Sequence, residues 1–326
     1  LYLNDGGGGF TRAPENALPD RRDSGGAAAA ADFDRDGDLD LFVGGRTVPG
    51  QYPRAPLSRL YRNEGGAFEE VTGDVAPGLN ESGMVTGALW TDVDGDGWID
   101  LMLALDWGPI KCWRNEEGQL VDATEAAGLA GRTGWWKGIA GRDLDGDGDL
   151  DYVVTNLGLN TKYHARPGEP LSLYYGDLDK SGTRRIVEAE FEEGELFPVR
   201  GRSCSTIAMP GLAERFETFE EFSLATLPEI YGEETLAGSQ RLTMTTLQST
   251  ILMNDGKGFF TFQELPRAAQ ISPSFGAAFA DVDLDGKSDL ILARTSSVPS
   301  GRRGGWTGGC LLYTYPSPRD LNPNLV

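Results

Sequence analysis

Short apolar runs recur along the chain, and each one follows a segment crowded with aspartate and glycine. The runs lie at residues 39–43, 99–103, 150–154 and 290–292. Most of them are about five residues long and rich in β-branched, leucine or aromatic side chains, a composition typical of buried β-strands. The pattern therefore predicts β-strands that begin where an acidic turn ends.

The residues just before each acidic segment are small, mainly glycine and alanine. They lie at 26–31, 87–88, 138–140 and 276–278. The alanine run at 27–31 by itself favours a helix. The other three copies have β-branched and aromatic neighbours, so together the four favour strands whose backbones crowd against each other. Such crowding is expected near the axis of a radial array of sheets.

A second motif precedes each acidic segment: an asparagine, an acid and a glycine set between two apolar runs, which predicts a β-hairpin. Its asparagines are Asn4, Asn63, Asn115 and Asn254. Each of them lies 27–29 residues before the next acidic segment begins. This constancy indicates that the hairpin, the crossing after it and the next strand form one repeated structural unit.

The repeat is interrupted once, between residues 156 and 249. Residues 173–182 begin a degenerate copy in which Arg185 replaces the last aspartate, and we interpret this copy as a turn without metal. After Pro210 the apolar residues follow helical spacing, and residues 236–247 are compatible with a further helix. We predict a mostly helical subdomain from about Pro210 to Gln248. The side chains expected to pack it against an edge or face of the repeats are Phe216, Phe219, Leu227 and Ile230.

Composition and charge narrow the class of protein. Apolar residues make up 39% of the 326 residues, enough for a core and too many for a disordered chain. The formal net charge is −21, and 18 of the 50 acids are aspartates of the four acidic segments. An acidic chain without a basic patch is not expected to bind nucleic acid or anionic membrane. No run of eighteen apolar residues occurs, so no membrane span is expected in this chain.

Each acidic segment has carboxylates at its positions 1, 3, 5 and 9 and glycine at position 6. A hard cation such as Ca²⁺ takes six to eight oxygen ligands, and alternate residues of a tight loop supply them from one side. We predict four calcium sites with these carboxylate ligands: Asp32, Asp34, Asp36, Asp40, Asp92, Asp94, Asp96, Asp100, Asp143, Asp145, Asp147, Asp151, Asp281, Asp283, Asp285 and Asp289. Position 7 adds a backbone carbonyl, from Asp38, Trp98, Asp149 or Lys287.

An EF-hand shares the first six positions of this loop but differs after them. It requires a glutamate at position 12 and a helix on each side. Here position 12 holds Val43, Leu103, Val154 or Leu292, inside or at the end of an apolar run. The cation loops are therefore expected to connect β-strands.

Taken together, the motifs resemble the FG-GAP/VCBS repeat family. The resemblance rests on Gly-Ala-x-x-Ala-Asp-x-Asp-x-Asp-Gly-x-x-Asp-Leu followed by Leu-Tyr-x-Asn-x-Gly-x-x-Phe, and it covers residues 1–293 with one interruption. It implies a β-propeller with calcium in loops between blade strands, as in integrin α-subunit heads. The insertion is similar to one in secreted bacterial members. The expected fold is all-β: about five blades of a six- to eight-bladed propeller, with a small α-helical insertion.

We expect four parts along the chain. Residues 1–155 carry blades with calcium loops 1–3, residues 156–249 the degenerate repeat and helical insertion, and residues 250–293 a blade with loop 4. Residues 294–326 resemble the translation of a sequencing adapter and are treated as a non-native tail. The chain opens within a repeat, so we expect the native protein to extend beyond both ends, with any signal peptide outside this fragment.

The resemblance implies a calcium-stabilised propeller that is secreted, periplasmic or on the cell surface and binds a protein or a glycan in adhesion. No enzyme is expected, because the conspicuous carboxylates are committed to metal. Two alternatives remain open, a propeller-type polysaccharide lyase or hydrolase and a scaffold domain of a larger enzyme. A deep pocket with carboxylates that bind no metal would favour the enzyme.

Overall fold

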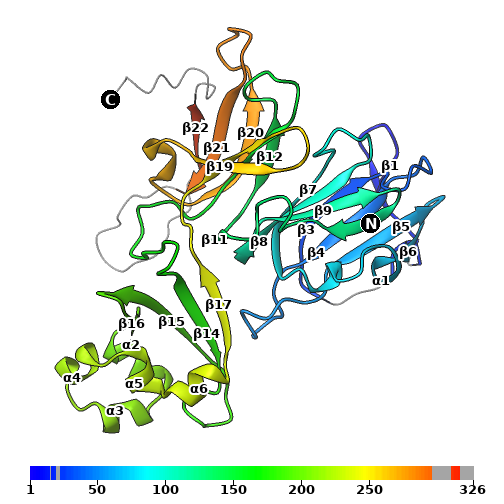
Figure 1. Cartoon of the computed structure of the whole chain (residues 1–326). Coiled ribbons are helices and arrows are strands. Elements are labelled where there is room, and N and C mark those ends of the chain that lie inside the picture. The colour runs from blue at the N-terminus through cyan, green and yellow to red at the C-terminus, as the bar shows by residue number, and fades with distance from the viewer. Residues whose placement is uncertain (15, 20–22, 296–309, 316–326) are drawn as a thin grey trace.

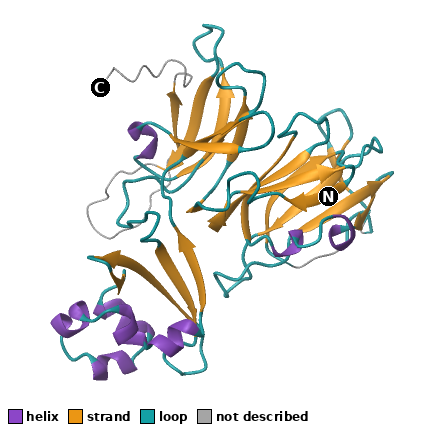
Figure 2. Ribbon diagram, viewed as in Figure 1, coloured by secondary structure: helices purple, strands orange, loops and turns teal. Residues whose placement is uncertain are grey.

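The computed structural model describes residues 1–14, 16–19, 23–295 and 310–315 and shows a mostly β protein (Figure 1). Its strands form antiparallel sheets of two to five strands, and most of the helices gather in one segment (Figure 2). The predicted all-β class is thereby confirmed. None of the described helices is long and apolar enough to cross a membrane.

Three of the sheets share one plan of four successively paired strands. The first contains β3 (Gly25–Ala31), β4 (Asp40–Gly45), β5 (Arg59–Glu64) and β6 (Ala67–Glu70). The second contains β7 (Met84–Thr91), β8 (Asp100–Pro109), β9 (Lys111–Glu116) and β10 (Gln119–Asp122), with β11 (Thr133–Trp135) also on β8. The third contains β12 (Ile139–Arg142), β13 (Asp151–Val154), β18 (Thr250–Asn254) and β19 (Phe260–Glu264).

Two smaller sheets and a few short helical turns complete the repeats. One sheet pairs β1 (Tyr2–Asn4) with β2 (Phe10–Arg12), and the other contains β20 (Ser274–Ala280), β21 (Asp289–Thr295) and β22 (Cys310–Tyr315). The helical turns are α1 (Thr72–Val75), η1 (Leu79–Glu81) and η2 (Arg267–Gln270). The strand β22 lies in the tail that we treated as non-native. Its backbone nevertheless pairs with β21, so this part of the tail belongs to a sheet. Arg294 and Thr295 of that tail end β21, and residues 296–309 and 316–326 lie outside the described residues.

The first strands of successive sheets lie side by side in chain order. β7 packs beside β3, β12 beside β7 and β20 beside β12. A Cβ atom added to Gly26 would lie 2.4 Å from the Val85 carbonyl oxygen, and one on Gly138 3.1 Å from that of Phe275. A side chain does not fit at the first separation, and at the second it would push the neighbouring backbone aside, so glycine suits the places where neighbouring backbones meet. The crowding predicted from the small residues is confirmed.

The strand β8 is buried on both faces because a sheet lies on each side of it. Alternate side chains of β8 enter different clusters: Leu101 and Leu103 pack between the first and second sheets, and Met102 and Ala104 between the second and third. This is why residues 101–105 of β8 are continuously apolar rather than alternating.

The insertion forms a sheet of its own with helices on one face. It leaves the third sheet after β13 and returns at β18. Its sheet has the order β16-β15-β14-β17. Its elements are β14 (Leu171–Gly176), β15 (Arg185–Glu192), β16 (Glu195–Pro198), α2 (Arg202–Ala208), α3 (Gly211–Arg215), α4 (Phe219–Leu224), α5 (Leu227–Tyr231), α6 (Glu233–Ala237) and β17 (Gln240–Met244). Figure 1 shows this unit at one end of the molecule.

Two expectations about the insertion were wrong. The helix expected over 236–247 ends at Ala237, and residues 240–244 form a strand because β14 supplies their backbone hydrogen-bond partners. The helices also do not pack on the repeats. Leu227 and Ile230 instead pack on Tyr174 and Val187 of the inserted sheet, whose opposite face packs on the second sheet near Trp107.

Candidate metal sites

Four groups of aspartates are close enough to share one ion, since the ligand atoms within each group lie within 4.8 Å of one another. Each group lies where the first strand of its sheet turns into the second, and Asp151 of the third group is the first residue of β13. The groups are Asp32, Asp34 and Asp36; Asp92, Asp94 and Asp96; Asp143, Asp145 and Asp151; and Asp281, Asp283 and Asp285. Converging carboxylates of this kind suit a hard divalent cation.

Each loop is shaped by its own side chains. In the first, the Asp32 carboxylate accepts the backbone N–H groups of Asp36 and Gly37, both at 3.1 Å. Gly37 has φ +97°, a conformation that favours glycine and turns the chain back toward the carboxylates. The N–H of each position 7 residue donates to the position 5 carboxylate at 2.7–3.0 Å: Asp38 to Asp36, Trp98 to Asp96, Asp149 to Asp147 and Lys287 to Asp285. The use of the position 7 carbonyls as ligands stays a prediction.

The position 9 aspartate begins the second strand and joins the loop to the hairpin. Asp100 is 1% exposed, and its carboxylate accepts the N–H of Val93 at 2.9 Å and that of Asn115 at 2.7 Å. The corresponding bonds join Asp40 to Phe33 and Asn63, and Asp151 to Leu144 and Asn254. Each carboxylate oxygen has a second lone pair, so these bonds leave capacity for an ion.

The fourth loop is the least enclosed of the four. Asp289 is only partly buried, and its carboxylate accepts the N–H of Val282 at 2.9 Å. The cluster carboxylates Asp281, Asp283 and Asp285 are exposed. We therefore expect an ion bound here to be more weakly held than in the first two loops.

Burial changes the acidity of the position 9 groups. It raises the pKa of Asp40 and of Asp100 to about 6, and it raises the pKa of Asp151. A carboxyl whose pKa rises on folding stabilises the fold at low pH, and this contribution is lost as the pH rises through the folded value. Without a cation, ionised Asp40 and Asp100 therefore destabilise the fold above about pH 6, and a bound cation would offset this effect.

The hairpin asparagines connect successive loops. The Asn115 side-chain amide donates to the carbonyl of Ile99, in its own loop, at 3.0 Å, and to that of Phe33, in the preceding loop, at 2.7 Å. Asn254 repeats this arrangement with Leu150 and Val93. Sequence reasoning treated these asparagines only as turn residues. The constant spacing joins each asparagine to the loop that follows it, so it gave no signal for these bonds to the loops that precede it.

Arginines add further links between the loops. Arg35, at position 4 of the first loop, donates to the Gly97 carbonyl of the second and lies 4.1 Å above the Trp98 ring. Arg114 binds Asp94 and also the carbonyl of Lys257 in the hairpin of the third sheet. The loops therefore form one connected edge across three sheets.

We expect Asn115→Ala to weaken calcium binding in the first loop, although Asn115 contacts none of its carboxylates. Loss of the hydrogen bond to the Phe33 carbonyl removes about 1 kcal/mol of stabilisation from the first loop, which corresponds to about fivefold weaker calcium binding there. Asn63→Ala is the matched control, because the Asn63 amide donates to Leu39 of its own loop. Calorimetric calcium titrations of both variants measure how far binding at one loop assists binding at the next. Of the two variants, only Asn115→Ala should reduce this cooperativity, because the Asn115 amide bonds to two loops. Equal cooperativity in the two variants would contradict this coupling.

The degenerate copy keeps the turn and lacks the carboxylate cluster. The N–H of Gly182 donates to Asp177 at 2.9 Å, as the corresponding glycine does in the first, second and fourth aspartate loops. Arg185 stands where the others have the position 9 aspartate. Among the described residues, no group of three candidate ligands includes this turn.

Comparison with known proteins supports the repeat assignment. Residues 1–43 and 92–154 match the model of the FG-GAP-like repeat, and these ranges contain the first three aspartate loops. A search of curated proteins finds no match. Among solved structures, the V. cholerae biofilm matrix protein Bap1 is similar at 11% identity and a TM-score of 0.30, over 97% of this chain and 66% of that chain. The present chain thus spans just under two thirds of that structure.

Proposed function

We propose that this chain, which carries FG-GAP-like repeats, is part of an extracellular, calcium-stabilised β-propeller that binds a protein or a glycan. The observation that carries the proposal is the placement of four aspartate loops at one end of first strands that lie side by side in chain order. Repeated sheets joined through their first strands are the arrangement of propeller blades. Extracellular calcium, at about 1 mM, is sufficient to fill sites of modest affinity.

In this proposal the ions stabilise the fold and the binding surface lies elsewhere. Each ion neutralises carboxylates that otherwise repel each other at the end of a strand pair. The resulting rigid array presents loops and the inserted unit to a partner. The FG-GAP-like repeat match supports adhesion-type binding, which requires no catalytic group.

An enzymatic role has less support. The FG-GAP-like repeat match favours a structural or adhesion module. The pocket in the inserted unit is lined by two carboxylates that belong to no metal group, Glu192 and Glu220, but both are solvent-exposed. General acid catalysis near neutral pH relies on a carboxyl whose pKa is raised by burial.

Binding of the labelled chain to arrays of glycans and extracellular proteins tests the proposal. We expect a defined subset of spots to retain the chain in calcium and to release it in EDTA, because loss of the ions loosens the binding surface. Release of new reducing ends or unsaturated sugars from polysaccharides would instead favour the enzyme. Retention that is identical in calcium and EDTA would contradict the calcium-stabilised function.

A further inference from the structure

The inserted unit has an acidity that the metal loops do not explain. Residues 185–237 contain twelve glutamates and four arginines and no other charged residue type. None of these glutamates belongs to a group of candidate metal ligands among the described residues. Uncompensated negative charge of this density attracts a cationic partner and repels an anionic one.

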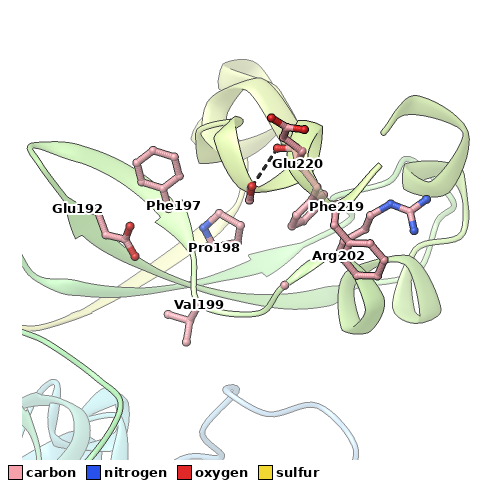
Figure 3. Close-up of a pocket in the computed structure, with 10 residues that line it drawn as sticks. Glu192, Phe197, Pro198, Val199, Arg202, Phe219 and Glu220 are labelled. Carbon is pink, nitrogen blue, oxygen red and sulfur yellow. Dashed lines mark hydrogen bonds between the residues drawn. The ribbon is translucent and has the colours of Figure 1, made fainter. Parts of the chain in front are cut away.

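A pocket of about 540 Å³ opens in this unit, between the β15–β16 hairpin, the start of α2 and the helix α4 (Figure 3). Phe197 and Pro198 line it from β16, and Phe219 lines it from α4. Glu192 and Glu220 are part of the same lining and are exposed. The volume lies in the range of sites that accept a small ligand or a few side chains.

The pocket presents apolar surface that the fold does not bury. The Phe219 side chain is 65% exposed although Phe222, one turn later in α4, is buried. Thr218 caps this helix through a reciprocal pair with Glu221, so the position of Phe219 is fixed by the start of the helix. An ordered, exposed aromatic side chain in an open pocket is a common anchor point for a partner.

The one basic side chain in the lining is already engaged within the unit. Arg202 donates to the carbonyl of Phe216 at 2.8 Å and lies 5.4 Å from the Phe219 ring centre. It therefore supports the wall of the pocket, while Glu192 and Glu220 remain available to a ligand. Because β16 is an edge strand of the inserted sheet, an extended peptide that pairs with it would bring its side chains to this pocket.

We propose that this pocket binds an extended, basic segment of a protein partner. An apolar or aromatic side chain of that segment packs against Phe197 and Phe219, and flanking lysine or arginine side chains pair with Glu192 and Glu220. The inference deepens the proposed function and rests on it, because it names the site and partner class of the same binding module. A second copy of this chain is not expected to occupy the pocket, because its net charge of −21 would be repelled by the acidic unit.

The test measures fluorescence anisotropy of a short labelled peptide in which lysine alternates with leucine around a central tryptophan. The intact chain in calcium is expected to bind it, more weakly as salt increases. Phe219→Ala should weaken binding about tenfold, the usual effect of truncating an anchor residue. Glu192→Gln combined with Glu220→Gln should weaken it by a similar factor and reduce the salt dependence. Ile207→Ser, at a position 82% exposed and outside the pocket lining, is the control and should leave binding unchanged.

Circular dichroism and thermal melts in calcium establish whether the variants are folded. We expect Phe219→Ala to fold, because the Phe219 side chain is exposed and contributes little to the core. The inference is overturned if the lysine peptide does not bind, or if the pocket variants bind it as tightly as the control. Tighter binding of a matched glutamate peptide or of a neutral oligosaccharide would also overturn it. If array binding in calcium persists in the pocket variants, the pocket assignment fails while the binding-module function stands.

Discussion

Removal of divalent cations with EDTA is expected to lower the melting temperature of this chain by about 10–20 °C. The four loops crowd carboxylates within 4.8 Å of one another at the ends of paired strands. At about 1 mM calcium and a dissociation constant of about 0.1 mM, each site adds roughly 1.4 kcal/mol to the free energy of unfolding. Four such sites contribute about 5–6 kcal/mol, comparable to the whole stability of many domains.

The measurement is a thermal melt followed by circular dichroism in calcium, in magnesium and in EDTA. Calcium should restore the melting temperature more fully than magnesium, because magnesium demands stricter octahedral geometry and gives up its water reluctantly. An unchanged melt in EDTA would contradict the presence of ions in the loops. Equal rescue by both metals would show that the loops do not select for calcium.

The second large effect is expected from Asp100→Ala. The Asp100 carboxylate is buried and accepts two backbone N–H groups, one from Val93 in its loop and one from Asn115 in the hairpin. Truncation leaves both donors without an acceptor and removes a predicted ligand of the second loop. We expect about 4 kcal/mol less stability in calcium, together with the loss of one bound ion.

Urea unfolding in calcium and in EDTA separates the two contributions. The loss that persists in EDTA reports the hydrogen bonds, and the additional loss in calcium reports the ion. Asp289→Ala should lower the free energy of unfolding by less than Asp100→Ala does, because Asp289 is only partly buried and its loop is more exposed. Arg185→Ala, at the same position of the degenerate copy, should not change calcium stoichiometry. A bound calcium lost from that variant would show that the degenerate copy is a site.

Much of the repeat could be predicted from the sequence because its determinants are local. Aspartates at alternate positions and a glycine at position 6 define the loop, and the loop fixes where the second strand begins. Asp40, Asp100 and Asp151 each start a strand, as the apolar runs indicate. The small residues before each loop likewise predicted that neighbouring first strands approach closely. The structure bears this out at Gly26, where the Val85 backbone leaves no room for a side chain.

Other features depend on partners that are far away along the chain, and these only the tertiary structure decided. Residues 240–244 form a strand because residues 171–175, far earlier in sequence, offer an unpaired edge, so local helical spacing misled the prediction. The inter-loop bond from Asn115 to Phe33 joins residues 82 positions apart. The interruption falls inside the third sheet because β18 returns to β13.

The sequence by itself determined the repeat and its aspartate loops, and it predicts calcium as their ion, because all the residues of one loop are nine consecutive positions. The fold alone decided how the loops are linked, which carboxylates converge and that Phe219 faces an open pocket rather than a core. The physical reason is that chelation and turn formation depend on neighbours in the chain. Burial and inter-sheet hydrogen bonding depend on neighbours in space.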